Sequence, residues 1–272
     1  MRGILLVLSQ GCKWRAIDRP EASWNSIYQY YRRWVRQGVF TEIFSQIELP
    51  LQGSRFFLDS THVKVHRCAS HPAGGPAAQA MGTTRGGRNT KIHAVVDGAG
   101  KPVRLLLSAG QEADITQAET LVEEIPATML VADKGCDSDA FCQWLLERGS
   151  KACLPPRANR PQKRSYRKPS YRKHHLVENF FERIKNFRHV ATRYDKLADT
   201  FLGFVCLAAT IVLLRSWVCK QALVLKPSAF LVRRLSQQTK TSRTETFSLQ
   251  ARLSTLPTTN LSARRARVTQ TI

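Results

Sequence analysis

The stretches RFFLD (residues 55–59) and TMLVAD (residues 128–133) decide the fold, because each reads as a buried β-strand that ends on an aspartate. Residues that bind ligands gather where such strands leave a sheet. Most aspartates at strand ends only cap a turn, so neither Asp59 nor Asp133 is informative alone. Both offer the oxygen ligands that Mg²⁺ or Mn²⁺ prefers, and a third acid decides between the two interpretations.

Glu178 is that third acid, in a helix that we predict over residues 171–188. Helical spacing places its apolar residues on one arc, namely Val177, Phe180, Phe181, Ile184 and Phe187. A second arc is polar and of mixed charge: Tyr171, His174, Glu178, Glu182 and Lys185. An ordinary solvated face is the alternative, but Glu178 and Glu182 repel each other at this spacing. A nearby cation or phosphate explains the polar arc better, so the three acids together predict a two-metal site for phosphodiester chemistry.

Residues 51–218 carry the pattern of one α/β domain. Strands are expected at residues 56–66, 90–97, 102–108, 128–132 and 151–154, and helices at 115–125, 139–148 and 171–188. This order is that of the ribonuclease-H-like fold, a mixed sheet flanked by helices in which the first and fourth strands are neighbours. Asp59 and Asp133 are therefore expected to lie side by side, and the predicted site depends on that adjacency.

A large positive charge indicates a polyanionic partner. The chain of 272 residues has a formal net charge of +22. Nucleic acid is the leading candidate, because each Lys or Arg that neutralises a phosphate releases a condensed counterion. We expect the proline-containing basic loop before residue 171, with Arg164, to clamp a nucleic-acid backbone, since unpaired like charges would repel in a merely solvated loop. The segment TRGGRN (residues 84–89) adds Arg88 to this surface.

An anionic membrane is the competing partner, and the sequence argues against it. No uninterrupted apolar run reaches the ~18 residues of a spanning helix, since the run at residues 201–214 is shorter and lies in an amphipathic setting. The apolar run at residues 4–8 is too short for a signal-peptide core. We therefore expect a cytoplasmic, nucleoid-associated protein without membrane contact.

Seven scattered cysteines without a Cys-x-x-Cys pair indicate reduced thiols. One cluster offers the side chains of a zinc site: His62, His66, Cys68 and His71. The first three lie at strand spacing, so they would share one face of an extended segment instead of surrounding an ion tetrahedrally. Zinc is therefore the weaker interpretation of this cluster.

Two appendages flank the α/β domain. Residues 1–50 are predicted to be helical and similar to a helix-turn-helix, with Arg32 and Arg33 as candidate DNA contacts beside an aromatic stripe. An aromatic stripe at helical spacing is usually core, and both interpretations stay open. The chain begins within an apolar segment, so we expect part of this domain to lie upstream. Residues 219–272, rich in Ser, Thr and Arg, are expected to be disordered.

Several separated blocks resemble the DDE transposases of bacterial insertion sequences, in the insertion-sequence-five group. The blocks follow one another between about residues 11 and 215, and are GCKWRAI, RRWVRQGVF, LDSTHVKVHR, RGGRNTKIHAVVDGAGKPVRLLLSAGQEADITQAE, LVADKGCDSDA, LPPR and YRKHHLVENFFERIKNFRHVATRYDKLADTF. The resemblance implies that Asp59, Asp133 and Glu178 hold two Mg²⁺ (or Mn²⁺) ions. It also implies cleavage at the ends of an insertion sequence, and then attack of the freed 3′-OH on target DNA.

The family's signature of Tyr, Arg, Glu and Lys falls on Tyr171, His174, Glu178 and Lys185. The resemblance implies that Tyr171 and Lys185 position phosphate. His174 departs from the pattern, because the family usually has Arg there, and Cys136 replaces a commonly aromatic residue. Histidine is a weaker and pH-dependent phosphate contact.

The partners implied are the terminal inverted repeats and the target DNA, bound by a homo-oligomer because synapsis joins two ends. One alternative is a catalytically impaired transposase remnant that only binds DNA. Another is a ribonuclease-H-like nuclease that cleaves without strand transfer.

Overall fold

The computed structural model describes residues 1–18, 22–47, 51, 53–126, 128–161 and 164–224, with residues 216–224 given by their backbone alone. Residues 1–217 form one compact unit. Most of the tail that is predicted to be disordered, from residue 225 on, lies outside the described residues. The division of this unit into an N-terminal and a catalytic domain stays a prediction.

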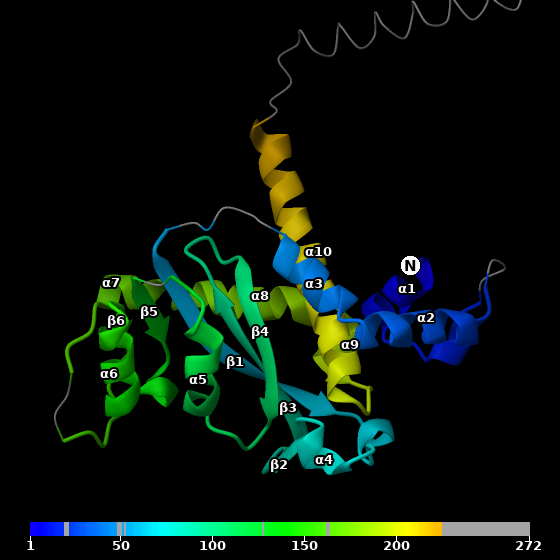
Figure 1. Cartoon of the computed structure of the whole chain (residues 1–272), viewed down its shortest axis with the longest axis horizontal. Helices are drawn as coiled ribbons and strands as arrows, with labels where there is room; N and C mark the ends of the chain where they lie inside the picture. Colours follow the sequence, from blue (N-terminus) through cyan, green and yellow to red (C-terminus); the bar gives the residue numbers. More distant parts are fainter. Residues whose placement is uncertain (19–21, 48–50, 52, 127, 162–163, 225–272) are drawn as a thin grey trace, which may run out of the picture. The chain divides into compact units, whose positions relative to one another are not determined.

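A mixed sheet of seven strands lies at the centre of this unit (Figure 1). The strands are β1 (Arg55–Val65), β2 (Gly82–Thr84), β3 (Gly87–Val96), β4 (Pro102–Ala109), β5 (Met129–Ala132), β6 (Lys151–Cys153) and β7 (Thr192–Arg193). Their order is β2-β3-β1-β5-β6, with β4 paired to β3 and β7 to β1. β1 is antiparallel to β3 and parallel to β5, and β5 is parallel to β6. The predicted ribonuclease-H-like sheet and the adjacency of β1 and β5 are confirmed.

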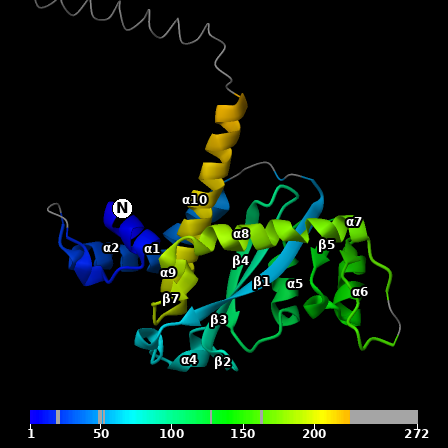
Figure 2. The same ribbon diagram turned by 180° about the vertical axis from the view of Figure 1, so that it is seen from behind.

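Helices pack on both faces of the sheet (Figures 1 and 2). The main ones are α5 (Ile115–Val122), α6 (Asp139–Glu147), α8 (His175–Lys185) and α10 (Ala198–Val224). Successive residues of β1 point to opposite faces. Phe56 joins a core with Leu121 of α5 and Phe141 of α6, whereas Phe57 joins a second core with Phe180 of α8. Burial on both faces explains why β1 reads as a continuous apolar run.

Short elements connect these layers. They are the 3₁₀ turns η1 (Trp14–Ala16), η2 (Arg67–Ala69) and η3 (Lys134–Cys136), and the helices α4 (Gly75–Ala78) and α9 (Arg188–Ala191). The turn η3 follows β5 directly, so it begins where Asp133 leaves the sheet.

The predicted helix over residues 171–188 is wrong in its first part. The chain there forms α7 (Lys168–Tyr171), a 3₁₀ turn η4 (Arg172–His174) and only then α8. The tighter turn accompanies the burial of the His174 ring against β1, where it contacts the Leu58 carbonyl. A tertiary contact of this kind overrides local helical spacing. The apolar arc of α8 is buried as predicted, from Val177 to Ile184.

The N-terminal helices α1 (Arg2–Gln10), α2 (Trp24–Arg36) and α3 (Val39–Gln46) share a core with α8 and α10. Tyr31 of α2 is fully buried and stacks on Phe204 of α10 at 4.4 Å between ring centroids. Its hydroxyl donates a 2.6 Å hydrogen bond to the Thr200 carbonyl. The aromatic stripe of α2 is therefore core at Tyr31.

Helix α10 is apolar on average over a longer stretch than the run at residues 201–214, although Asp199 and Arg215 interrupt this stretch. Residues Ala198–Arg215 form a helical window of 18 residues with a mean hydropathy of 1.8, long and apolar enough by composition to cross a membrane. The amphipathic setting that we predict for residues 201–214 is wrong, because buried residues from Phe201 to Ala209 lie on all sides of the helix. Within the fold 61% of the window is buried, as in the core helix of a globular protein.

Candidate active site

Asp59 lies within β1 and not at its end, because pairing with β3 carries β1 on to Val65. The parallel pairing with β5 does stop here, at Leu58 opposite Ala132. Asp59 and Asp133 are therefore the next residues after the last paired positions of two neighbouring strands. Asp59 is half-buried, and its Oδ1 accepts a 2.7 Å hydrogen bond from the Ser60 N–H.

Asp133 begins the turn η3 in an extended backbone conformation. Its Oδ1 accepts a 2.6 Å hydrogen bond from the Lys134 N–H and lies 3.5 Å from the Tyr171 hydroxyl, which donates to it. This hydroxyl also stands among carboxylates, and burial with the nearby Asp133 charge raises the pKa of Tyr171 to about 12. Tyr171 is thus a neutral hydrogen-bond donor beside the site at physiological pH.

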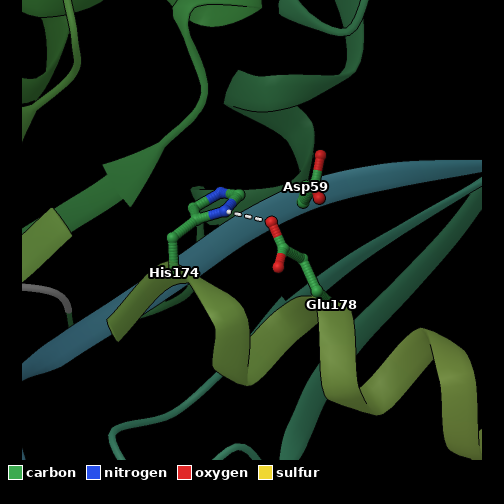
Figure 3. A group of neighbouring side chains, drawn as sticks. All are labelled: Asp59, His174 and Glu178. Carbon is green, nitrogen blue, oxygen red and sulfur yellow. Dashed lines mark ion pairs between the residues drawn. The ribbon is translucent and has the colours of Figure 1, made fainter. Parts of the chain in front are cut away.

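Glu178 lies in the first turn of α8 and reaches toward Asp59 from the helix side (Figure 3). Its side chain is 61% exposed, and its Oε1 lies 3.5 Å from Nδ1 of the buried His174. Asp59, His174 and Glu178 each offer a ligand atom within 4.8 Å of the others, and no other such group occurs among the described residues. The His62, His66, Cys68 and His71 cluster thus forms no such group, and Asp133 stands beside the three rather than among them.

The ionisation of Asp59 reflects both its burial and the acids around it. Burial raises the pKa of Asp59 to about 6, and the carboxylates of Asp133 and Asp114 push it in the same direction against the Ser60 hydrogen bond. Like charges held close together oppose each other's ionisation. A divalent cation would offset this repulsion, and carboxylate oxygens are the ligands that Mg²⁺ and Mn²⁺ favour. The donor set therefore fits these metals.

Asp114 borders the site and was missed from the sequence. Its Oδ1 accepts hydrogen bonds from the Ser60 hydroxyl at 2.7 Å and the Lys91 ammonium at 2.9 Å. Burial alone would raise the pKa of Asp114, but these bonds and the Lys91 charge lower it on balance. Lys91 was the available signal, because a lysine within the strand expected at residues 90–97 needs a counter-charge once buried. Asp114 thus joins Ser60, the residue after Asp59, to Lys91 of β3.

The basic loop before α7 is tied to the protein itself. Arg160 pairs with Asp137 and Asp139, and Arg164 pairs with Asp139 and contacts the Cys142 sulfur. Arg157 donates from Nε to the Lys134 carbonyl at 3.1 Å and from Nη2 to the Gly135 carbonyl at 2.8 Å. The hydrogen bonds of Arg157 thus hold the turn η3 in place. DNA contact by Arg164 stays a prediction, and these pairings argue against it.

Two other predicted DNA contacts are also engaged within the protein. The Lys185 ammonium lies 2.5 Å from the Thr61 hydroxyl and 3.1 Å from the His62 carbonyl, on β1 beyond Asp59. Burial lowers the pKa of Lys185. Arg88 donates to the Ser70 carbonyl. Lys185 lies beside Thr61, two residues after Asp59, whereas Arg88 lies at the β2–β3 turn.

A hollow of about 620 Å³ lies between the N-terminal helices and the start of α10. Aromatic and basic side chains dominate its lining: Lys13, Trp14, Arg15, Trp24, Tyr28, Arg32, Tyr194 and Lys196. Arg32 lies 5.8 Å from the Tyr28 ring centre and donates to the Tyr28 hydroxyl. Arg33, the other predicted contact of α2, lies over Tyr30 outside this hollow.

Family models match most of this chain. A transposase DDE domain matches residues 50–213, and a putative transposase domain of the IS4/5 family matches residues 1–44. A putative transposase for insertion sequence element IS6501 from Brucella ovis is 32% identical over 130 residues, which are 46% of this chain and 98% of the relative. A putative transposase for IS402 from Burkholderia cepacia is 26% identical over 170 residues, 58% of this chain and 74% of the relative.

Among solved structures, the piggyBac transposase synaptic complex with hairpin DNA aligns with a TM-score of 0.45 and 10% identity. The alignment covers 75% of this chain and 56% of that one. The two family models together match residues from 1 to 213, and the matched ranges include Asp59, His174 and Glu178. The chain belongs to the insertion-sequence transposases with a DDE domain.

Proposed function

We propose that this transposase cleaves DNA at the ends of an insertion sequence and joins the freed 3′ ends to target DNA. Asp59, Asp133 and Glu178 would hold two Mg²⁺ or Mn²⁺ ions. When bound, these ions supply an activated water or 3′-OH and stabilise the leaving oxygen. The observation that carries the proposal is the β1–β5 pairing: Asp59 and Asp133 are the next residues after its last paired positions, and Glu178 faces Asp59.

The remaining residues would bind and orient the DNA. Tyr171 can donate a hydrogen bond to a phosphate oxygen from its place beside Asp133. Lys185 offers an ammonium on the same stretch of β1. Holding the phosphodiester in line for attack supplies much of the rate in such reactions.

The proposed partners are the element's terminal inverted repeats and the target DNA, met on the nucleoid in the cytoplasm. The net charge of +22 supports a polyanionic partner. Bringing two element ends together requires at least two active sites, so a homo-oligomer on DNA is part of the proposal, and a membrane is not.

A DNA-binding remnant without catalysis is the second candidate. His174 favours it, because this residue takes the place of the arginine that the resemblance leads us to expect. The position of Asp133 beside the group of three ligand atoms favours it as well. The two candidates differ in cleavage and not in DNA binding.

The test is cleavage and joining of a labelled DNA fragment that carries the element ends, with Mg²⁺ or Mn²⁺. We expect Asp133→Asn to slow cleavage at least ~100-fold, because metal stabilisation of the transition state is worth several kcal/mol. Glu182→Gln, an exposed acid one turn along α8, is the matched control and should cleave normally. DNA binding without cleavage by the wild type under either metal would overturn the proposal and support the remnant.

A further inference from the structure

The hydrogen-bond partners of His174 decide which of its ring nitrogens carries a proton. Nε2 lies 3.3 Å from the Leu58 carbonyl oxygen, which can only accept, so Nε2 carries the hydrogen. Nδ1 is then the nitrogen that faces Glu178, 3.5 Å from Oε1. In a neutral ring this nitrogen is an acceptor, so two acceptors face each other.

A proton or a metal ion between the two groups would remove this repulsion. A proton on Nδ1 gives an ion pair between His174 and Glu178, four residues apart. The third group favours a metal, because Asp59 adds a second carboxylate, and one ligand atom from each of the three residues lies within 4.8 Å of the other two. Ligand bonds of about 2.1 Å place two ligand atoms at most about 4.2 Å apart. The 3.5 Å between His174 Nδ1 and Glu178 Oε1 meets this limit.

We propose that His174 is a metal ligand through Nδ1, so that Asp59, His174 and Glu178 form a mixed nitrogen and oxygen site. The inference rests on the proposed metal-dependent function. The surroundings of the ring are those of a metal-binding histidine, whose second nitrogen commonly donates to a backbone carbonyl. The Tyr171 ring stacks on it with centroids 5.5 Å apart and planes at 22°, which fixes its orientation.

A nitrogen ligand changes metal preference. Mg²⁺ binds almost entirely through oxygen, whereas imidazole suits transition metals, and Mn²⁺ accepts both donor types. The site should therefore favour Mn²⁺ over Mg²⁺ more strongly than a site of carboxylates alone. An arginine at residue 174, which has no free lone pair, cannot produce this preference.

Mn²⁺ bound to the full chain without DNA provides the test. Electron spin-echo spectroscopy detects coupling between Mn²⁺ and a ligand ¹⁴N nucleus, and we expect such coupling in the wild type. His174→Gln should remove it and weaken Mn²⁺ binding ~10-fold or more, with a smaller loss for Mg²⁺. His175→Gln is the matched control, because His175 is exposed and its ring forms a hydrogen bond with the Arg172 carbonyl, away from the proposed metal site. It should keep both the coupling and the affinity.

Absence of ¹⁴N coupling in the wild type, or no Mn²⁺ binding, would overturn the proposal and leave the ion pair as the explanation. The wild-type spectrum needs no variant, so a misfolded His174→Gln protein does not affect the decision. Failure here is distinct from failure of the proposed function, because cleavage that disappears in Asp133→Asn would still establish metal-dependent chemistry with oxygen ligands.

Discussion

Asp59 is where folding and metal binding oppose each other. Its folded pKa of about 6 lies above the unfolded value of 3.8, chiefly because it is buried. Such a group favours folding below the unfolded pKa, and that contribution is lost as pH rises through 6. Without metal, Asp59→Asn should therefore be more stable than the wild type by about 3 kcal/mol at pH 8, a gain that shrinks to about 0.6 kcal/mol at pH 4.

Urea unfolding of the metal-free proteins from pH 4 to pH 8 measures this difference. Glu182→Gln, an exposed acid on the same side of α8 as Glu178, serves as the control and should track the wild type. A gain for Asp59→Asn that is independent of pH would contradict the prediction. Added Mn²⁺ should reverse the order at pH 8, since only the wild type gains from binding.

At the scale of secondary-structure elements, the sequence predicts the sheet well and the loops poorly. The run that contains Phe56 and Phe57 is apolar because both faces of β1 are covered, and such a run can be recognised from the sequence alone. Asp59 and Asp133 could be paired from strand order alone. Other features depend on partners far along the chain, which local spacing does not encode. They are the turn η4, the ion pair of Asp114 with Lys91, and the hydrogen bonds of Arg157 to the turn η3.

The hydrogen bonds of Arg157 to the turn η3 lead to a prediction. Arg157 binds the carbonyls of Lys134 and Gly135, and its backbone N–H donates to Asp137 at 2.9 Å, so it fixes the turn that starts at Asp133. Arg157→Ala should lower the single-turnover cleavage rate ~10- to 100-fold through misplacement of Asp133. DNA affinity should stay within about twofold, because this arginine is engaged internally.

Arg167→Ala is the matched control for this experiment, because Arg167 is exposed in the same loop and contributes its backbone carbonyl to the fold. It should leave the cleavage rate unchanged. An Arg157→Ala protein that cleaves at the normal rate once bound, but binds DNA weakly, would instead make Arg157 a phosphate contact.

At the scale of the whole molecule, the described Lys and Arg side chains divide into those that are paired with acids, here called engaged cations, and those without an ion pair, here called free cations. Arg160 and Arg164 are neutralised by acids, whereas Lys13, Arg15 and Lys196 around the hollow form no ion pair with any described residue. The free cations should dominate DNA binding. Changing the three to Gln should flatten the dependence of log affinity on log salt by about 0.9 for each phosphate that the protein no longer neutralises.

Fluorescence anisotropy with labelled DNA at several salt concentrations measures this slope. The double change of Arg160 and Arg164 to Gln is the control, with a slope expected to match the wild type. A flatter slope for the control than for the triple variant would contradict this division and restore the basic loop as the DNA clamp.

The contact between Tyr31 and Thr200 has a consequence for how the protein is made. These partners are 169 residues apart, so the ribosome adds the second roughly 10–30 s after the first. Until α10 emerges, Tyr31 of α2 lacks the Phe204 ring and the Thr200 carbonyl that it contacts in the fold. A product that stops before residue 198 would contain Asp59, Asp133 and Glu178 and still lack the α10 part of the core that the N-terminal helices share, which exposes apolar surface to proteases and aggregation. Premature stops would thus yield short-lived fragments, and only chains that extend through α10 would persist in the cell.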